Sequence, residues 1–452
     1  MRVESRGRPA CLPYCWCRCF GNLFPKLGIC LALALAVPGM ASEPLRLTLD
    51  DAAKMALEKS PVLKGAQAEV EAAQARAGQE ASKRRLTISA TAVESSSDMG
   101  ANLMTPPGIM PQNVFGLPAR RAALGDLMAM YPLFTGGKLR AGAEAGRRLA
   151  ASAAQDRAAM ELDVIYGVRK AFWQSLLARA LVDEYSAAAD ESRERVRIAE
   201  EKHKEGKIAL YDLLRNRTDL AEAEREVNNA KRDLDLALIG LKLGMGVPAG
   251  QAVVLEGELA SAELPENADQ EIASALASRP EVLGAMEKVA AAEHRLSAVR
   301  ALYHPQVYLS GMADAISTPG GSDSGYLIGV VASLPIVDGG MRKSEAQEAK
   351  AMLDRAKADL EQAKLRTEAE VRAAWSEVAA ARDNASLAEA AVVQAEEDYR
   401  VVKLRYEAGK GINVELLDAF AAMVRAKTNR LTAIFDLNVA ADAVARAVGV
   451  KQ

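Results

Sequence analysis

Two acidic residues near the end of the chain, Glu415 and Asp418, stand three positions apart in a segment with helical character. Side chains with this spacing share one face of a helix, so both carboxylates would point the same way. Such a pair attracts cations, and copies arranged around one axis would concentrate the charge. The ordinary alternative is that the two acids favour the helix dipole in a first turn that Asn413 caps.

No other group of residues has the spacing of a catalytic or metal-binding site. The chain holds only three histidines, which argues against a multi-histidine metal centre. It has no phosphate loop, nucleophile elbow, dinucleotide fingerprint or zinc-ligand spacing. The formal net charge of -3 gives no reason to expect nucleic acid as a partner. We therefore expect no enzyme activity, no cofactor and no bound metal.

All five cysteines lie between Cys11 and Cys30, in a segment with the features of a signal peptide. Basic residues precede an apolar run over 27–37, and small residues at Gly39 and Ala41 suit a signal peptidase. The run is too short to span a bilayer as a mature helix. Ile29 before Cys30 makes a poor lipidation site. We expect residues 1–41 to be removed, leaving an exported, unlipidated chain without cysteine.

An internal repeat organises the rest of the chain. Residues 131–137 resemble residues 334–340, since each segment carries a proline followed by two glycines, and Pro132 and Pro335 are 203 positions apart. The same separation holds without a gap as far as Val247 and Val450. Upstream the separation is larger, because the first copy carries a Pro- and Gly-rich loop over 95–120 where the second has a short loop over 317–324. The chain is therefore a duplication.

Each copy has the pattern helix, strand, loop, strand, very long helix, tight turn, long helix. Thr48 and Asp51 resemble a capping box before a short helix that Pro61 interrupts. Alternating residues predict β-hairpins at about 86–133 and 306–335, with Pro132 and Pro335 ending strands and the glycines allowing a sharp change into a helix. Uninterrupted helical patterning over about 138–203 and 341–407 predicts two helices of about 100 Å each.

These elements predict a mainly α fold with a small β part. Its expected parts are the signal peptide (1–41), a first repeat (42–250), a linker or equatorial segment (251–279) and a second repeat (280–452). Helices this long need lateral, coiled-coil support. Four strands per chain are too few to close a barrel with a lumen side and a lipid side, so several chains must share one barrel.

This layout resembles the TolC-like outer-membrane efflux and secretion channels. The resemblance is carried by residues 47–52 with Pro61, the elements at Pro132 and Pro335, and the helical tips at 207–214 and 406–419. It covers residues 43–452 and includes the duplication. No single motif is highly specific, but the ordered set is.

The resemblance implies a homotrimer whose shared twelve-stranded β-barrel, four strands from each chain, lies in outer-membrane lipid and continues into a periplasmic α-helical barrel. It implies that the closed periplasmic end opens when a periplasmic adaptor (membrane fusion) protein and an inner-membrane transporter dock. Such a channel passively conducts the cargo of a tripartite efflux or type I secretion system. The pump selects that cargo among drugs, metal ions, solvents and proteins.

The resemblance also assigns roles to residues of a periplasmic gate. Glu415 and Asp418 match the family's acidic ring, so a trimer would place six carboxylates in one constriction. Asp212 and Tyr406 match residues that tie neighbouring hairpins in the closed channel. The basic partner expected nearby falls on Gly411, so that link is missing or is supplied by Lys410.

The hairpin tips of the two copies are the expected contacts of the adaptor. They hold Gly206 and Lys207 in the first copy and Gly409 and Lys410 in the second. The glycines also permit the tight turn, and both roles are compatible.

Two other classes of protein remain open from the sequence. A non-pore periplasmic adaptor or scaffold with helical hairpins would not need the alternating strands present in both repeats. A cytosolic coiled-coil protein would need neither the signal segment nor the duplicated Pro-Gly-Gly elements. Solubility only in detergent after fractionation would separate the channel from both.

Overall fold

The structure, a computed structural model, describes residues 45–96, 121–260, 268–318 and 321–450. The predicted signal peptide and most of the predicted loop over 95–120 lie outside these residues. The first half contains β1 (Leu45–Leu47), α1 (Leu49–Lys59), α2 (Pro61–Ser82), β2 (Thr87–Ser96), β3 (Arg121–Phe134), α3 (Lys138–Lys204) and α4 (Leu210–Met245). The second half contains β4 (Val253–Leu255), α5 (Ala268–Ser278), α6 (Pro280–Arg300), a 3-10 turn (Ala301–Tyr303), β5 (Gln306–Thr318), β6 (Gly321–Ser333), α7 (Met341–Glu407) and α8 (Asn413–Val448).

The helices repeat with the register that the sequence indicates. Helices α3 and α7 have 67 residues each, and α4 and α8 have 36 each. Their first residues obey the separation of the two prolines, Lys138 matching Met341 and Leu210 matching Asn413. At 1.5 Å per residue, each of the two longest helices is about 100 Å long.

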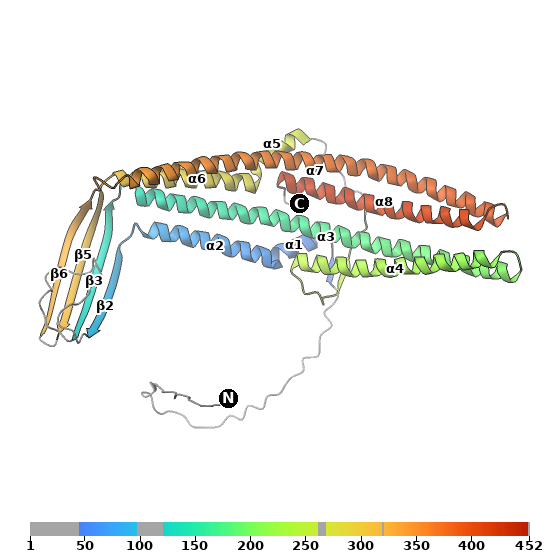
Figure 1. The fold of residues 1–452 in the computed structure, drawn as a ribbon, viewed down its shortest axis with the longest axis horizontal. Helices are drawn as coiled ribbons and strands as arrows, with labels where there is room; N and C mark the ends of the chain where they lie inside the picture. The colour runs from blue at the N-terminus through green and yellow to red at the C-terminus, as the bar shows by residue number, and fades with distance from the viewer. Residues whose placement is uncertain (1–44, 97–120, 261–267, 319–320, 451–452) are drawn as a thin grey trace, which may run out of the picture. The chain divides into compact units, whose positions relative to one another are not determined.

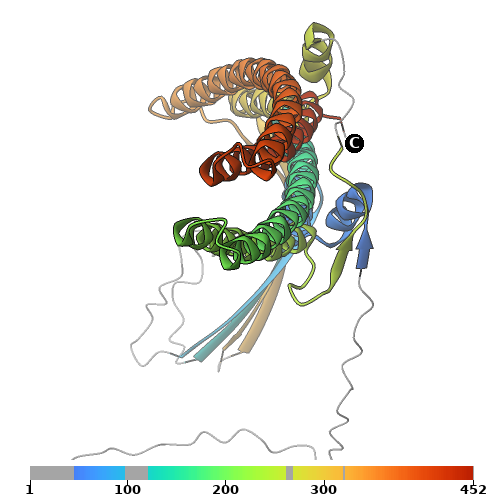
Figure 2. The same ribbon diagram turned by 90° about the vertical axis from the view of Figure 1, so that its right-hand side faces the viewer.

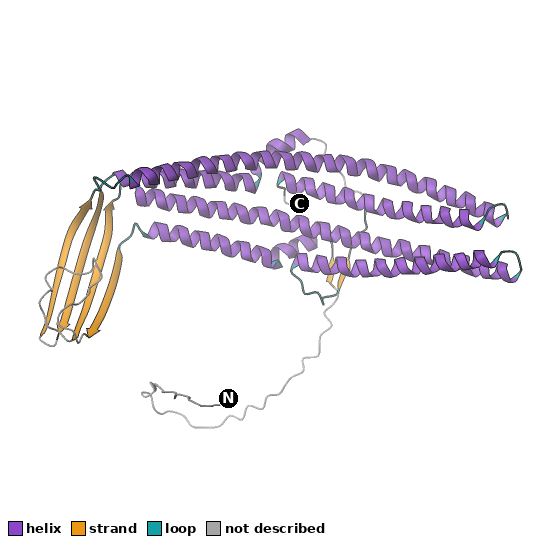
Figure 3. Ribbon diagram, viewed as in Figure 1, coloured by secondary structure: helices purple, strands orange, loops and turns teal. Residues whose placement is uncertain are grey.

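The long helices have strands at one end and tight turns at the other. A strand precedes each of α3 and α7, and a short turn follows each of them. Figure 3 shows the four longer strands gathered beyond the first end. Seen nearly end-on in Figure 2, the neighbouring helices lie in a curved layer. Among the helices of the described residues, none combines the length and apolar character that a membrane crossing requires.

The four longer strands form one antiparallel sheet in the order β2-β3-β5-β6. They are longer than the alternation predicts: β5 runs to Thr318 and β6 starts at Gly321, so most of the loop predicted over 317–324 is strand. The prediction that Pro132 ends its strand is wrong. Pro132 pairs with Tyr308, and β3 continues to Phe134 through a register shift. Proline is tolerated at such an irregularity, where a missing N–H costs little.

Paired glycines turn the chain from strand to helix in both copies. Gly136 and Gly137 have φ of 59° and 91°, and Gly339 and Gly340 have 63° and 93°. Residues with a side chain rarely adopt this left-handed backbone conformation, so the prediction that these glycines allow the sharp change from strand to helix is confirmed. A Cβ at Gly136 would also lie 2.5 Å from the Cβ of His304, which closes the position to any side chain.

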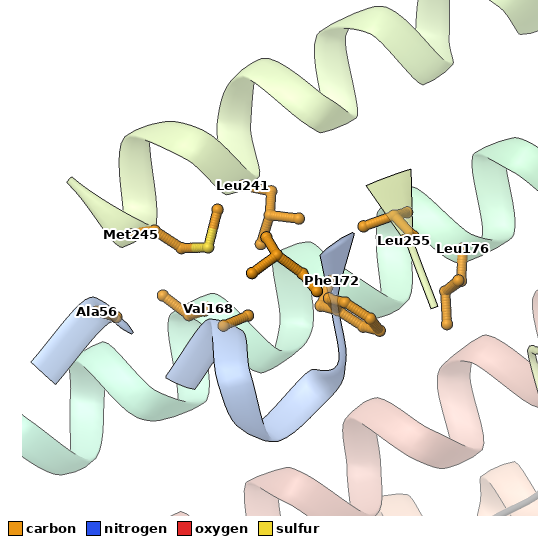
Figure 4. Packing of buried hydrophobic residues seen from close by; sticks show 9 residues of the cluster. Ala56, Val168, Phe172, Leu176, Leu241, Met245 and Leu255 are labelled. Carbon is orange, nitrogen blue, oxygen red and sulfur yellow. The ribbon is translucent and has the colours of Figure 1, made fainter. Parts of the chain in front are cut away.

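The largest apolar cluster lies where α1, α3 and α4 meet the small sheet of β1 and β4 (Figure 4). Phe172 of α3 is buried against Leu241 and Met245 of α4 and against Leu47 and Leu255 of the sheet. The two three-residue strands pair in parallel, Leu45 opposite Val253. Strands of three residues are too short to show a period, so the sequence gives no signal for β1 and β4. Helix α5 lies within 251–279, where a linker or equatorial segment is expected. The cluster fixes the root of the first long hairpin.

Candidate functional site

The hairpin tips are two closely similar helix ends. In the first, Gly206 has φ of 73°, and its N–H donates to the carbonyl of His203 at 2.9 Å. The N–H of Lys207 donates to the carbonyl of Lys202 at 2.8 Å. In the second, Gly409 has φ of 71° and donates to Tyr406 at 3.1 Å, while Lys410 donates to Arg405 at 2.9 Å. Both pairs form the Schellman motif, which satisfies the last carbonyls of a helix.

The lysines at the tips have different surroundings. Lys207 pairs with Glu205 at 2.7 Å, and both side chains are more than half exposed. Exposed Lys410 makes no ion pair with any residue that the structure describes. A Cβ at Gly411 would lie 3.1 Å from the backbone nitrogen of Tyr406, so a side chain at the position expected to carry a basic partner would need the backbone to shift. Within one chain, neither residue supplies the basic link.

Asp212 and Tyr406, which the sequence places far apart, come together between the two hairpins. Burial first and then the negative charge of Asp212 raise the pKa of the Tyr406 phenol. The ammonium of Lys202 lies 4.6 Å from the centre of the Tyr406 ring, a cation–π distance. The first hairpin therefore surrounds Tyr406 with one acid and one base.

Glu415 and Asp418 lie on the exposed side of α8. The opposite side of the same turn buries Leu416, Leu417 and Phe420. In the described part of the chain neither acid forms an ion pair or a side-chain hydrogen bond, so both carboxylates are free to face a lumen or a partner.

The prediction that Asn413 caps α8 is wrong. The N-cap residue is Ile412, which makes no side-chain capping bond, and Asn413 is the first helical residue. The side chain of Asn413 points between the hairpins, where its Oδ1 accepts a hydrogen bond from Nδ2 of Asn216 at 3.2 Å. Tertiary contact therefore overrides the local preference of asparagine for the cap.

A second set of contacts joins the hairpins further from the tips. The Tyr399 hydroxyl of α7 donates to Glu191 of α3, and the Lys403 ammonium lies 3.1 Å from the same carboxylate. Burial raises the pKa of Glu191, but the bonds from Tyr399 and Lys403 outweigh it and the net pKa is lowered. Burial and the Glu191 carboxylate raise the pKa of Tyr399.

Arg195 of α3 completes this second set. Its guanidinium carbon lies 3.7 Å from the centre of the Phe420 ring of α8, and its Nη2 lies 2.7 Å from the carboxylate of Asp219. A buried arginine needs both an apolar cover and an opposite charge, and these two residues supply them. No local pattern marks Glu191, Arg195 and Tyr399, because charged and aromatic residues on a long helix look alike in the sequence whether they face water or another helix.

The site therefore consists of two helix tips, a set of contacts between hairpins and two unpaired acids. Among the described residues, no three histidine, cysteine or acidic side chains are placed to hold a metal ion.

Comparison with protein families gives one extended match. A model described as "Outer membrane efflux protein" matches residues 52–247 and 272–450. The outer membrane efflux protein BepC of Brucella suis is 27% identical over 241 residues, which are 52% of this chain and 53% of that protein. The toluene efflux pump outer membrane protein TtgC of Pseudomonas putida is 24% identical over 340 residues, 72% of this chain and 68% of that protein. The match thus spans about half the length of BepC.

Solved structures share the fold over most of the chain. The outer membrane channel CmeC of Campylobacter jejuni has a TM-score of 0.75 and 20% identity, over 89% of this chain and 85% of that one. The outer membrane protein VceC of Vibrio cholerae has a TM-score of 0.72 and 21% identity, over 89% and 96%. At these identities the likeness establishes the fold.

Proposed function

We propose a channel function from one premise: the chain belongs to the outer membrane efflux protein family. In this proposal it lies in the bacterial outer membrane with a large periplasmic part. It conducts substrates passively from a periplasmic adaptor protein and an inner-membrane transporter, in a tripartite efflux or type I secretion system, to the exterior. It does no chemistry on the cargo and needs no cofactor.

The observation that carries the proposal is the four-stranded sheet with two unlike faces. The register places Ser89, Met128, Met312 and Leu327 in one row across the strands, with Thr91, Asp126 and Asp314 in the next row of that face. The other face carries Ile88, Leu127, Tyr326 and Ile328, all more than half exposed. The first face is mixed and carries the carboxylates of Asp126 and Asp314, which suits a water-filled lumen, and the exposed apolar face suits lipid.

The edges of the sheet support an oligomer. Strands β2 and β6 each have one neighbour among the described strands, so each leaves one edge unpaired. Unpaired backbone groups are costly in lipid, and joining β6 of one copy to β2 of the next removes every edge when the ring closes. Three copies would form a barrel of twelve strands, so we propose a homotrimer.

The helices would carry the channel into the periplasm. With strands at one end of helices about 100 Å long, the tips would stand far from the membrane. There Glu415 and Asp418 from three copies would form a ring of six carboxylates, closed in part through Asp212 and Tyr406. The tips at Gly206, Lys207, Gly409 and Lys410 would contact the adaptor.

The proposal is tested with the purified, detergent-solubilised protein. Its mass should be that of three chains, and it should form channels in planar bilayers. Glu415→Gln with Asp418→Asn should weaken cation selectivity and block by multivalent cations, since the shape is kept and the charge is lost. Glu361→Gln, at an exposed acid far from the tip on α7, is the control and should change neither property.

One result would overturn the channel function and another the role of the two acids. A stable monomer without channel activity would favour the non-pore periplasmic adaptor or scaffold. Unchanged selectivity and block in the double variant of a conducting trimer would leave the two acids as ordinary helix-start residues.

A further inference from the structure

A buried pair of amides joins the two hairpins close to the tips. Asn216 in the second turn of α4 and Asn413 at the start of α8 are 3% and 5% exposed. Nδ2 of Asn216 donates to Oδ1 of Asn413 at 3.2 Å, and it also donates to the backbone carbonyl of Asp212 at 2.8 Å. We call this pair the amide bridge.

The second bond fixes the direction of the first. A carbonyl oxygen only accepts, so the atom of Asn216 that meets Asp212 must be the amide nitrogen. The same nitrogen faces Asn413, which must therefore present its oxygen. Both hydrogens of the Asn216 amide are used, one on each side of the gap between the hairpins.

The amide bridge is not part of the duplicated pattern. In the other copy, the position of Asn216 is held by Ala419 and the position of Asn413 by Leu210. Both asparagines thus replace apolar residues, and they do so at the two positions that meet. A general requirement of the helical tips would place the same residues in both copies.

The bridge lies between the residues of the gate. It ties the backbone of Asp212 to a residue two positions before Glu415, and α4 and α8 both begin at the tip end of the hairpins (Figure 1). A side chain at neighbouring Gly411 would press on the backbone of Tyr406. Among the described residues, the amide bridge is a direct polar link between the second turn of α4 and the start of α8.

We propose that the amide bridge between Asn216 and Asn413 is the latch that ties the start of α8 to α4 within one chain and sets how often the channel opens. The inference rests on the proposed channel function and adds two positioning residues to it. Nδ2 of Asn413 is buried without a hydrogen-bond partner in the described part of the chain. An unpaired buried donor is unfavourable and gains a partner when water reaches it, so the closed contact can break.

The test uses the full-length protein in planar bilayers. Asn216→Ala and Asn413→Leu place in each position the residue that the other copy already carries there. Each should raise the open probability about fivefold, the factor that a typical hydrogen bond corresponds to. The double variant should gain no more than either single one, because all three remove the same bond. Asn413→Asp keeps the shape and the acceptor oxygen, so its open probability should stay close to that of the wild type, while its added negative charge can change ion selectivity.

Each outcome has a definite meaning. If the wild-type protein forms no channels, the proposed function itself fails. If it conducts and the single variants leave the open probability unchanged, or if their effects simply add, the latch is refuted. If Asn413→Asp opens the channel as much as Asn413→Leu, a bond to the acceptor oxygen is not what holds the contact, and the latch is refuted. Far-UV circular dichroism and the trimer mass of each variant show whether it is folded. If Asn413→Leu does not fold, the test rests on Asn216→Ala.

Discussion

Replacing Leu241 by alanine should destabilise the protein far more than the same change two residues away. Leu241 of α4 is 0% exposed in the apolar cluster with Phe172 and Met245, whereas Leu243 on the same helix is 78% exposed. Leucine and alanine have similar helix propensities, so the change in helix propensity contributes little to the free energy of unfolding, and about equally at the two positions. The difference between the two variants isolates burial.

The magnitude follows from the surroundings of Leu241. Losing the buried side chain removes about 2 kcal/mol of transfer free energy. A cavity adds to this cost unless the neighbours collapse into it. Collapse is limited here, because Val168 and Phe172 belong to α3, a helix also held by α1 and by the small sheet. We expect Leu241→Ala to lower the free energy of unfolding by about 3–4 kcal/mol, and Leu243→Ala by less than about 0.5 kcal/mol.

Denaturant unfolding of the detergent-solubilised protein, followed by far-UV circular dichroism, measures this difference. Where unfolding is irreversible, unfolding rates at one denaturant concentration replace the free energies. Equal losses at the two positions, or a loss below about 1 kcal/mol at Leu241, would refute the assignment of this cluster as the root of the first hairpin.

Two further predictions concern α3. The folded-state pKa of Glu191 is lowered below 4.5, so its carboxylate contributes stability above that pH, and this stability is lost as the pH falls through the folded-state pKa. Glu191→Gln should therefore reduce thermal stability at neutral pH and make little difference in strong acid. An equal loss of stability at the two pH values would contradict this. Gly167→Ala should stabilise the helix by about 1 kcal/mol, since no heavy atom lies within 4 Å of the new Cβ. Gly146→Ala should gain less or lose stability, since its Cβ would lie 3.1 Å from Cα of Ala77; equal melting shifts for the two variants would show that α2 and α3 are not in close contact there.

The sequence predicts the long elements of this protein because each repeats a local period many times. The helices from Lys138 and Met341, the alternation around Ile88 and Leu309 and the separation of Pro132 from Pro335 are all visible without a fold. Each element is indicated by backbone geometry or by a pattern repeated over many residues, so one residue that departs from the pattern does not change the prediction of a helix or strand. The family and the mainly α fold follow from these elements.

Short or irregular pieces are predicted less well. The strands β1 and β4 have three residues each and exist because they pair with one another and cover the cluster at Phe172. Their formation depends on a partner more than 200 positions away in the chain, for which a local pattern carries no signal. The continuation of β3 through Pro132 likewise depends on its pairing with Tyr308.

The contacts between the hairpins are decided by the tertiary structure alone. The sequence places Asn413 at a helix start, where asparagine favours the cap, but only the fold brings Asn216 within reach of its side chain. In the same way Glu191 and Tyr399 look like ordinary residues of separate helices until α3 and α7 lie side by side. Periodicity fixes which face of a helix is apolar, whereas a hydrogen bond between helices depends on their relative rotation and register, which no local pattern encodes.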